Sequence, residues 1–448
     1  MKKSLLITLT LGLSFCSLAQ TKVLTFEDAV KIALRNGVLL NTQKNNLELN
    51  VMQRNYSIAG LGPTLNINTT AQRVYGNTFI QQKGIVINGK VDNVAGSLNS
   101  NINLFNGFSQ VNRVRQAESA LDAQSFYVNR TSQDIISTIS LQYLQVLLDI
   151  ELLKIANENW VALKKTLEQI KEQVALGAKS PVDEYNQDSQ AKGGEILALQ
   201  AQINLLNDRA LLTQTLLMDP NEEFDVVKPD WDVNSVTADK MELEPLFDTA
   251  LKNRGDYLRA KKNEESSRFG MKAFKATMLP TLSMYNTIYT TYNYVYLDVN
   301  NSFDQQVKSD NLRKFTGFQL TIPILGGNQN LQNRTNYITQ KITYNNNQLA
   351  TKNAEIQVKT DVMRAYQNMK LYAQSYTLNI DQVKSAEKAL ELETERYTLG
   401  ATSFVEYANA NRVLVQAQTS KAQSEYRLLF QKVLVDYAIG TIKPEDFK

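Results

Sequence analysis

One short motif occurs twice in this chain and divides long helical segments each time. Leu176 to Asp183 reads LGAKSPVD, and Leu399 to Glu406 reads LGATSFVE. A glycine followed by a small polar residue is a common way to end one helix in a left-handed cap before the next helix begins. A Gly-Ser turn that occurs once is equally well explained as a simple helix stop. Its duplication favours two helical hairpins, with Gly177 and Gly400 as the tip glycines.

The segments around the two tips repeat as well, so we expect a fold with internal pseudo-symmetry. Each copy reads as helix, β-hairpin, long helix, tip and helix. From about Gln110 to Ala175 there is no proline or glycine, and a continuous helix of that length would approach 100 Å. The predicted divisions are a first repeat at 20–218 (strands about 64–75 and 95–105, helices about 109–176 and 181–218), a connector at 219–241, a second repeat at 242–440 (strands about 281–296 and 314–325, helices about 328–399 and 403–439) and a tail at 441–448. A further helix is expected at 25–59, and polar loops at 76–93 and 298–313.

The first residues have the three regions of a secretory signal peptide. Lys2 and Lys3 are basic, the run from Leu5 to Leu13 is apolar, and small residues precede Gln20. We therefore expect residues 1–19 to be removed. The alternative is lipidation of Cys16, but the bulky Phe15 stands where a lipidation motif has a small residue.

Composition excludes several classes of chemistry. The chain has no histidine, and its one cysteine, Cys16, leaves with the signal peptide. A histidine-dependent triad, a thiol nucleophile, the usual zinc sites and disulfides are therefore excluded, and we assign no catalytic, metal-binding or cofactor-binding residue. Removing Lys2 and Lys3 leaves 46 basic against 45 acidic residues, which argues against a nucleic-acid partner. Beyond the signal peptide no run of 18 apolar residues exists, so no transmembrane helix is expected.

The strand segments alternate between apolar residues and uncharged polar residues, which is typical of a transmembrane β-barrel. A soluble β-sandwich is the alternative, but its outer face would carry charge. Tyrosines near the strand ends fit an interfacial belt. Four strands cannot close a barrel, and open edges are not tolerated in lipid, so several chains must combine. The residues expected to face lipid are Leu98, Ile102, Leu320 and Ile322; those expected to face water are Asn99, Asn101, Gln319 and Thr321; the belt tyrosines are Tyr75, Tyr292, Tyr294 and Tyr296.

With this duplicated plan, the chain resembles the TolC family of outer-membrane efflux proteins. The resemblance is carried by the order of several short motifs: Leu279-Pro280-Thr281-Leu282 with its counterpart at Pro63, the turns at Gly107 and Gly326-Gly327, and the segment from Arg396 to Gly400. It implies a mainly α fold with a transmembrane β-barrel, in which a homotrimer forms a 12-stranded barrel and a periplasmic α-helical tunnel. It also implies a passive exit duct for efflux or secretion, in contact with outer-membrane lipid, a periplasmic adaptor and an inner-membrane transporter.

The resemblance further implies roles for residues near the two tips. Glu406, Asn409 and Asp183 fall where the family places residues of a periplasmic entrance ring. Tyr397 falls at the position of a latch tyrosine. Thr402 stands where that latch usually has a basic residue, and Lys179 holds the equivalent place in the first copy. The alternative for Glu406 and Asp183 is an ordinary acidic residue in the first turn of a helix, which the helix dipole favours.

Two other classes of function compete with the duct. A secreted coiled-coil rod that binds a surface partner is compatible with the helices, but it has no use for two β-hairpins with neutral polar faces. An outer-membrane enzyme would need a catalytic constellation, and the sequence offers none. We therefore expect a duct that is not an enzyme.

Overall fold

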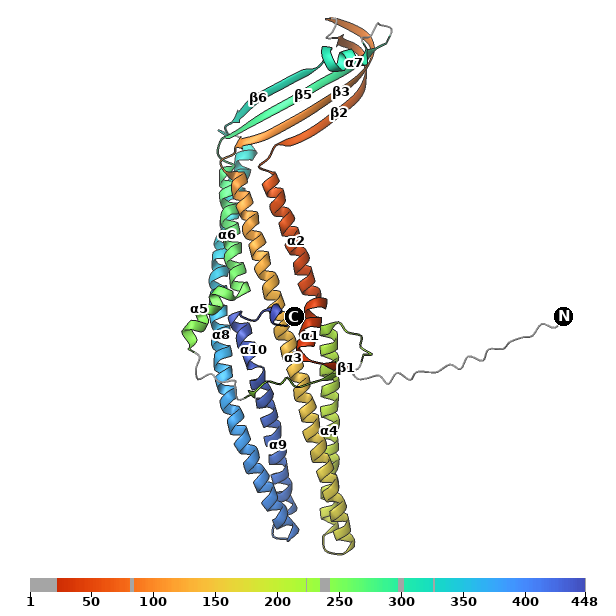
Figure 1. The fold of residues 1–448 in the computed structure, drawn as a ribbon, viewed down its shortest axis with the longest axis vertical. Coiled ribbons are helices and arrows are strands. Elements are labelled where there is room, and N and C mark those ends of the chain that lie inside the picture. Colours follow the sequence, from red (N-terminus) through yellow and green to blue (C-terminus); the bar gives the residue numbers. More distant parts are fainter. Residues whose placement is uncertain are drawn as a thin grey trace, which may run out of the picture.

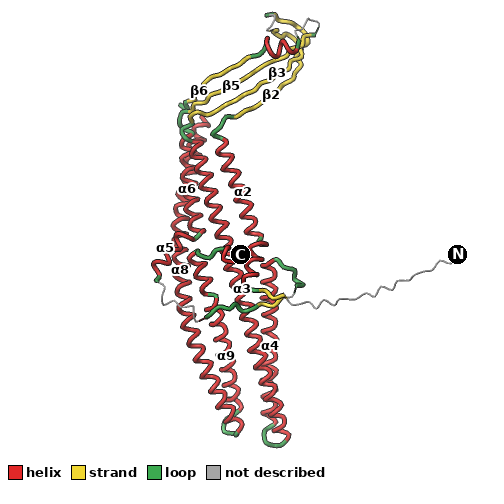
Figure 2. The backbone as a smooth tube through the Cα atoms, in the orientation of Figure 1, coloured by secondary structure: helices red, strands yellow, loops and turns green. Residues whose placement is uncertain are grey.

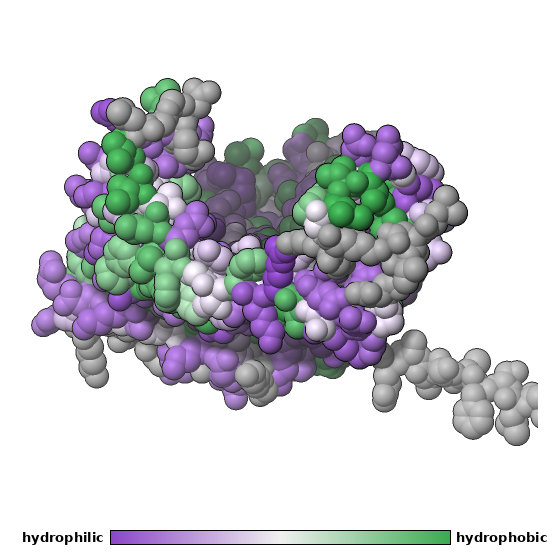
Figure 3. All heavy atoms as spheres, turned by 90° about the horizontal axis from the view of Figure 1, so that it is seen from above, coloured by the Kyte–Doolittle hydropathy of each residue, from purple (hydrophilic) through white to green (hydrophobic). Residues whose placement is uncertain are grey.

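The computed structural model describes residues 22–80, 84–222, 224–233, 242–296, 302–324 and 327–447. It shows an elongated molecule with a β-sheet at one end and two helical hairpins that end together at the other (Figure 1). The predicted signal peptide, Cys16 and Gly326 lie outside the described residues. Seen from the sheet end, the molecule curves around a hollow on one side, and the visible wall of this hollow is mostly hydrophilic (Figure 3).

Two antiparallel helical hairpins form the lower body (Figures 1 and 2). The first hairpin consists of α3, Ser109–Ala175, and α4, Pro181–Leu216. The second consists of α8, Gly327–Thr398, and α9, Phe404–Leu429. Among the described residues, α3 alone contains a window that is long and apolar enough to cross a membrane, but half of that window is buried inside the chain. Its apolar residues therefore serve the core of the helical body.

Shorter helices pack beside the upper parts of α3 and α8 (Figure 1), and two predicted helices are interrupted. The segment predicted as one helix at 25–59 is α1, Phe26–Asn36, followed by α2, Val38–Ala59. The break falls at Gly37, whose added Cβ would lie 2.7 Å from the carbonyl oxygen of Ala33. The helix predicted at 403–439 is likewise broken, after α9, at Phe430. The remaining helices are α5, Leu243–Asn253, α6, Gly255–Ala276, α10, Gln431–Ile439, and the 3-10 turn η3, Pro444–Phe447.

Aromatic packing at the waist of the molecule accounts for the second break. Phe430 is fully buried, and its ring lies 5.4 Å from that of Phe26 and 5.1 Å from that of Trp231. Directly beside this cluster, β1, Lys22–Leu24, pairs in parallel with β4, Phe224–Val226. The β4 strand lies in the predicted connector. Tertiary contacts at the waist therefore override the local helical pattern at Phe430.

The sheet contains four antiparallel strands in the order β2-β3-β5-β6. Their bounds are Thr64–Ile80 for β2, Ile85–Phe105 for β3, Thr281–Val295 for β5 and Arg313–Thr321 for β6. One face carries aligned apolar residues, because Ile67 pairs with Leu98 and Leu98 with Ile288. The side chain of Ile67 is 77% exposed. This apolar face has no partner within the described part of the chain, as a lipid-facing surface requires.

The strand predictions for the first hairpin were wrong at their outer ends, whereas those for the second agree there within one residue. The predicted polar loop at 76–93 is largely strand, because β2 and β3 continue together to Ile80 and Ile85. Cross-strand contacts support this extension: Arg73 Nε lies 2.5 Å from Asp92 Oδ1, and the Tyr296 hydroxyl donates to Asp92 Oδ2 over 2.8 Å. Backbone ladder bonds need no apolar alternation, so a strand can continue where the alternating pattern used to predict it is interrupted by polar residues and glycine.

Two smaller corrections concern the inner ends of the strands. The strand predicted at 314–325 ends at Thr321, so Ile322 lies outside it; Pro323 follows and has no N–H to donate to a ladder. In β3 a register shift occurs between Asn103 and Phe105, after which Phe105 pairs with Leu282. The predicted loop at 298–313 contains, in its described part, the short helix α7, Phe303–Gln305, and the π-helix η2, Gln306–Asp310.

Two carboxyl groups lie near each other on α3 and α4 in the first hairpin, Asp149 and Asp208. Asp149 is buried, and its Oδ2 has no hydrogen-bond partner among the described residues. Burial first, and then Asp208, raise the pKa of Asp149 to about 7, while a hydrogen bond from Gln145 acts in the opposite direction. The folded state therefore holds a proton on Asp149 more tightly than the unfolded chain does.

The stability of the helical body should consequently fall as the pH rises from about 4, the ordinary range of an aspartate, to the pKa of Asp149 at about 7, and then level off. Asp149→Asn should flatten this dependence and raise the melting temperature at pH 8, because an amide carries no charge to bury. Melting followed by helical circular dichroism measures both effects. Asp188→Asn, on the same hairpin but paired with Lys192 at the surface, is the control. An unchanged pH profile in Asp149→Asn would contradict the raised pKa of Asp149.

Candidate functional site

The two hairpin turns at the lower end have the same backbone geometry. Gly177 and Gly400 adopt φ values of 71° and 72°. In the first turn Ala178 N donates to Gln173 O over 2.8 Å, and in the second Ala401 N donates to Arg396 O over the same distance. No atom lies within 4 Å of a Cβ added at either glycine, so the positive φ alone explains the glycine at each tip.

Each turn leads directly into a capped helix. The Ser180 side chain accepts a hydrogen bond from Val182 N over 3.2 Å, and the Ser403 side chain accepts one from Glu406 N over 3.4 Å. Asp183 and Glu406 lie in the first turns of α4 and α9, where the helix dipole favours acidic residues. The capping geometry therefore fixes where both carboxylates project from the chain.

A contact between the two tips joins the hairpins within one chain. The Lys179 ammonium lies 3.3 Å from the centroid of the Tyr397 ring, and its Nζ donates to the Tyr397 carbonyl oxygen over 3.4 Å. Burial lowers the pKa of Lys179, and the charge of Asp183 partly opposes that effect. A cation over an aromatic face contributes about 0.5–1 kcal/mol at exposed sites and about 2 kcal/mol when desolvated.

A small apolar cluster supports Tyr397 from its other side. Its ring stacks on that of Tyr407 at 5.3 Å with an interplanar angle of 13°, and Ile170 of α3 packs against both. Burial raises the pKa of Tyr397 to about 12, with smaller contributions from Asp183 and Tyr407. The Tyr397 hydroxyl is buried and has no hydrogen-bond partner among the described residues. We call Lys179, Tyr397, Tyr407 and Ile170 the tip cluster.

The structure brings together only some of the site residues predicted from the sequence. Lys179 contacts Tyr397, and Asp183 lies near enough to influence the pKa of both. Thr402 is half-buried in the second turn. Glu406 is exposed, and among the described residues its side chain makes no ion pair or hydrogen bond. Asn409 accepts a hydrogen bond from Arg412 over 2.8 Å, one turn further along α9.

A groove of about 750 Å³ runs between the two hairpins above the tips. Residues of α3, including Leu163, form part of its lining, and α4 and α9 supply the rest, among them Asn409 and Arg412. An added Cβ at Gly194 would lie 2.9 Å from Leu163. Gly194 therefore permits the close approach of α4 to α3 beside this groove. A glycine in a helix with no turn signal nearby indicates such a close approach.

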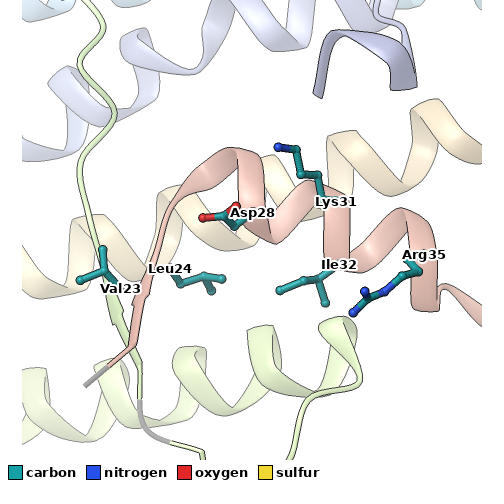
Figure 4. A pocket seen from close by; sticks show the side chains of 6 residues that line it. All are labelled: Val23, Leu24, Asp28, Lys31, Ile32 and Arg35. Carbon is teal, nitrogen blue, oxygen red and sulfur yellow. The ribbon is translucent and has the colours of Figure 1, made fainter. Parts of the chain in front are cut away.

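A second cavity, of about 350 Å³, lies at the waist beside β1 and α1 (Figure 4). Asp28, Lys31 and Arg35 are the charged residues among those that line it. The Thr25 hydroxyl donates a hydrogen bond to the Asp28 carboxylate over 2.7 Å. The same hydroxyl oxygen accepts a hydrogen bond from Asp28 N over 3.1 Å and so caps α1. The contacts of Asp28 thus belong to a helix start, and the tips remain the candidate site.

Comparison with known proteins agrees with this architecture. The sequence pattern of the outer membrane efflux protein family matches residues 40–216 and 246–441. The outer membrane protein TolC of Vibrio cholerae is 22% identical over 373 residues, which cover 79% of this chain and 78% of that protein. The crystal structure of VceC from Vibrio cholerae matches with a TM-score of 0.79 and 15% identity, covering 93% of this chain and 96% of that one. The CmeC outer membrane channel of Campylobacter jejuni matches with a TM-score of 0.75 and 16% identity, covering 93% and 85%.

These findings confirm the fold class predicted from the sequence, which is a helical tunnel with a transmembrane β-barrel. They also agree with the outer-membrane location that the signal peptide and the strand pattern indicate. The family match spans both repeats and most of the chain. This chain therefore belongs to the outer membrane efflux protein family.

Proposed function

We propose that three copies of this chain form the exit duct of an efflux or secretion system. The observation that carries the proposal is the sheet: it has an exposed apolar face, and its edge strands β2 and β6 each pair on one side only within the described chain. Lipid does not tolerate open strand edges, so β6 of one copy must pair with β2 of the next until the ring closes. Efflux channels of this family are trimers, and three sheets of four strands give a 12-stranded barrel.

The duct would continue through the periplasm as a tunnel of three pairs of hairpins. We propose that Glu406, Asp183 and Asn409 surround its entrance, and that Tyr397, Lys179 and Thr402 belong to the latch that holds it closed. The exposed Glu406 side chain supports the first assignment, and the contact between Lys179 and Tyr397 supports the second. In this chain Lys179 supplies the cation that the second turn lacks at Thr402.

The partners would be a periplasmic adaptor and an inner-membrane transporter, because channels of this family work with both in general. The groove of about 750 Å³ between the hairpins combines apolar residues such as Leu197 and Phe404 with polar residues such as Gln200 and Asn409. Such a mixed lining suits a helix that packs against the tunnel and also meets water. The duct itself would perform no chemistry.

Crosslinking of membranes that contain the protein tests the proposal directly. We expect a trimer that resists detergent and dissociates on heating, and large steady channels when the purified trimer is added to planar lipid bilayers. A soluble periplasmic monomer without channel activity would overturn the duct. That result would instead favour the secreted coiled-coil rod.

Glu406→Gln tests the entrance ring separately. If three copies of Glu406 surround one narrow opening, their charges attract cations, as charged rings do in channels. The substitution should weaken block by divalent cations added on the tunnel side in single-channel recordings, without changing trimer assembly. Glu184→Gln, on a neighbouring helix start, is a matched control. Unchanged cation block in Glu406→Gln would leave its carboxylate as a helix-start residue only.

A further inference from the structure

The two edge strands of the sheet differ in length. β2 has 17 residues and β6 has 9. β6 begins at Arg313, opposite Tyr289 of β5, although β5 continues to Val295. Both edge strands adjoin the helical body at their inner ends, β2 through Thr64 and β6 through Thr321 (Figure 1). In a closed ring, β6 therefore reaches only the inner half of the neighbouring β2.

The upper edge of β5 is nevertheless covered within the chain by residues 302–311, which we call the clasp. The side chain of Gln306 is buried and bridges both backbone groups of one strand residue: its Oε1 accepts from Asn293 N over 3.0 Å, and its Nε2 donates to Asn293 O over 3.1 Å. Asn311 Nδ2 donates to Thr291 O over 2.7 Å. These side chains replace the ladder bonds of a missing strand, which is one way that proteins protect a sheet edge.

Two further contacts hold the clasp in place. The Thr290 hydroxyl donates to the Val307 carbonyl oxygen over 2.7 Å, and the Phe303 ring lies 5.2 Å from that of Tyr292. Other residues of the clasp remain exposed, including the ion pair between Asp304 and Lys308. The clasp thus occupies the place of β6 above Arg313 and presents an outer surface where β6 would meet the next chain.

The edge that this surface would meet is the outer half of β2. Its backbone is extended and, among the described residues, pairs only with β3, and Tyr75 and Phe79 there are 72% and 61% exposed. Half of the backbone groups in an edge strand point away from its one partner. An exposed edge of this length with large aromatic residues would attract other chains unless something covers it.

We propose that the clasp of each copy packs against residues 73–79 of β2 in the neighbouring copy and continues the subunit seam beyond the end of β6. The partner is a second copy of this chain. The clasp extends the edge formed by β6, and in a closed ring β6 pairs with the inner half of β2 in the next copy. The clasp would therefore lie beside the outer half of that same β2. This inference rests on the proposed trimeric barrel, and it adds a contact that β6 and β2 alone do not supply.

Cysteine crosslinking tests the clasp, because the mature chain has no cysteine of its own once residues 1–19 are removed. Double variants combine Tyr75→Cys, Asn77→Cys or Phe79→Cys with Asp304→Cys or Lys308→Cys, all at exposed positions. We expect at least one combination to give disulfide-linked trimers on oxidation, and each single variant to give none. The double variant Asn66→Cys with Gln319→Cys tests the contact between β2 and β6 of neighbouring copies near the helical body. Amine crosslinking measures trimer assembly in every variant. A trimer in which no upper combination forms a disulfide overturns the clasp, whereas a monomer in every variant overturns the duct.

Gln306→Ala gives a second measurement that does not depend on cysteine geometry. Loss of the bridge to Asn293 should loosen the clasp and lower the temperature at which the detergent-resistant trimer dissociates. Gln305→Ala changes the exposed neighbour and should leave that temperature unchanged. Equal dissociation temperatures for the two variants would show that the clasp adds nothing to the subunit seam.

Discussion

Ile67→Arg should abolish assembly of the trimer in the outer membrane, whereas Asn68→Arg should be tolerated. Ile67 lies on the apolar face, in one row with Leu98 and Ile288, well inside the apolar part of β2. A cation on the lipid face costs about 2–4 kcal/mol near the bilayer midplane, and three chains incur this cost together. Asn68 is the next residue and projects from the opposite face, which would line the water-filled lumen.

The measurement is the yield of heat-dissociable trimer in the membrane fraction, with total protein quantified in parallel. The sequence pattern alone suggested Leu320 for this test, with Gln319 as its control. The structure places Leu320 one residue before the end of β6, where the cost of an arginine falls to about 0–1 kcal/mol. Ile67 is therefore the sharper position. Equal trimer yields for Ile67→Arg and Asn68→Arg would contradict the assignment of the lipid face.

The helical hairpins could be predicted because their signals are local. A period of 3.6 residues defines the long helices, and Gly177 and Gly400 mark their ends with a backbone conformation that few other residues adopt. Gly177 and Gly400 both have the positive φ that such a turn requires. The inner halves of the strands were predictable for the same reason. Apolar and polar residues alternate there, as expected for a strand with one face toward lipid and one toward water.

The features that the sequence could not reveal depend on contacts between distant residues. The outer halves of β2 and β3 lack regular alternation, and pairs such as Arg73 and Asp92 connect the two strands there. The helix break at Phe430 follows from aromatic packing against the N-terminal helix. The Lys179 contact joins residues 218 positions apart. Motif spacing placed both of its members near a tip, but only the folded chain shows that they touch.

Lys179→Met should raise the resting conductance of the channel without changing trimer assembly. The substitution keeps most of the apolar stem of the side chain and removes the ammonium that lies over the Tyr397 ring. Three latches, each worth about 0.5–1 kcal/mol, would together shift the balance between closed and open states by roughly 10- to 100-fold, since 1.4 kcal/mol corresponds to a factor of ten. Lys171→Met, on the same hairpin but paired with Glu168 at the surface, should behave like the unmodified protein.

Two further variants separate the cation from the hydroxyl in this latch. Lys179→Arg keeps a cation that can stack on the ring, so it should restore the low resting conductance. Tyr397→Phe keeps the aromatic face but removes a hydroxyl that has no partner among the described residues of its own chain. If Tyr397→Phe raises the resting conductance as much as Lys179→Met does, the hydroxyl bonds to a neighbouring chain in the closed trimer and the latch spans subunits. If Tyr397→Phe is silent while Lys179→Met leaks, the contact within each chain holds the tips together. Low conductance in Lys179→Met would remove Lys179 from the latch.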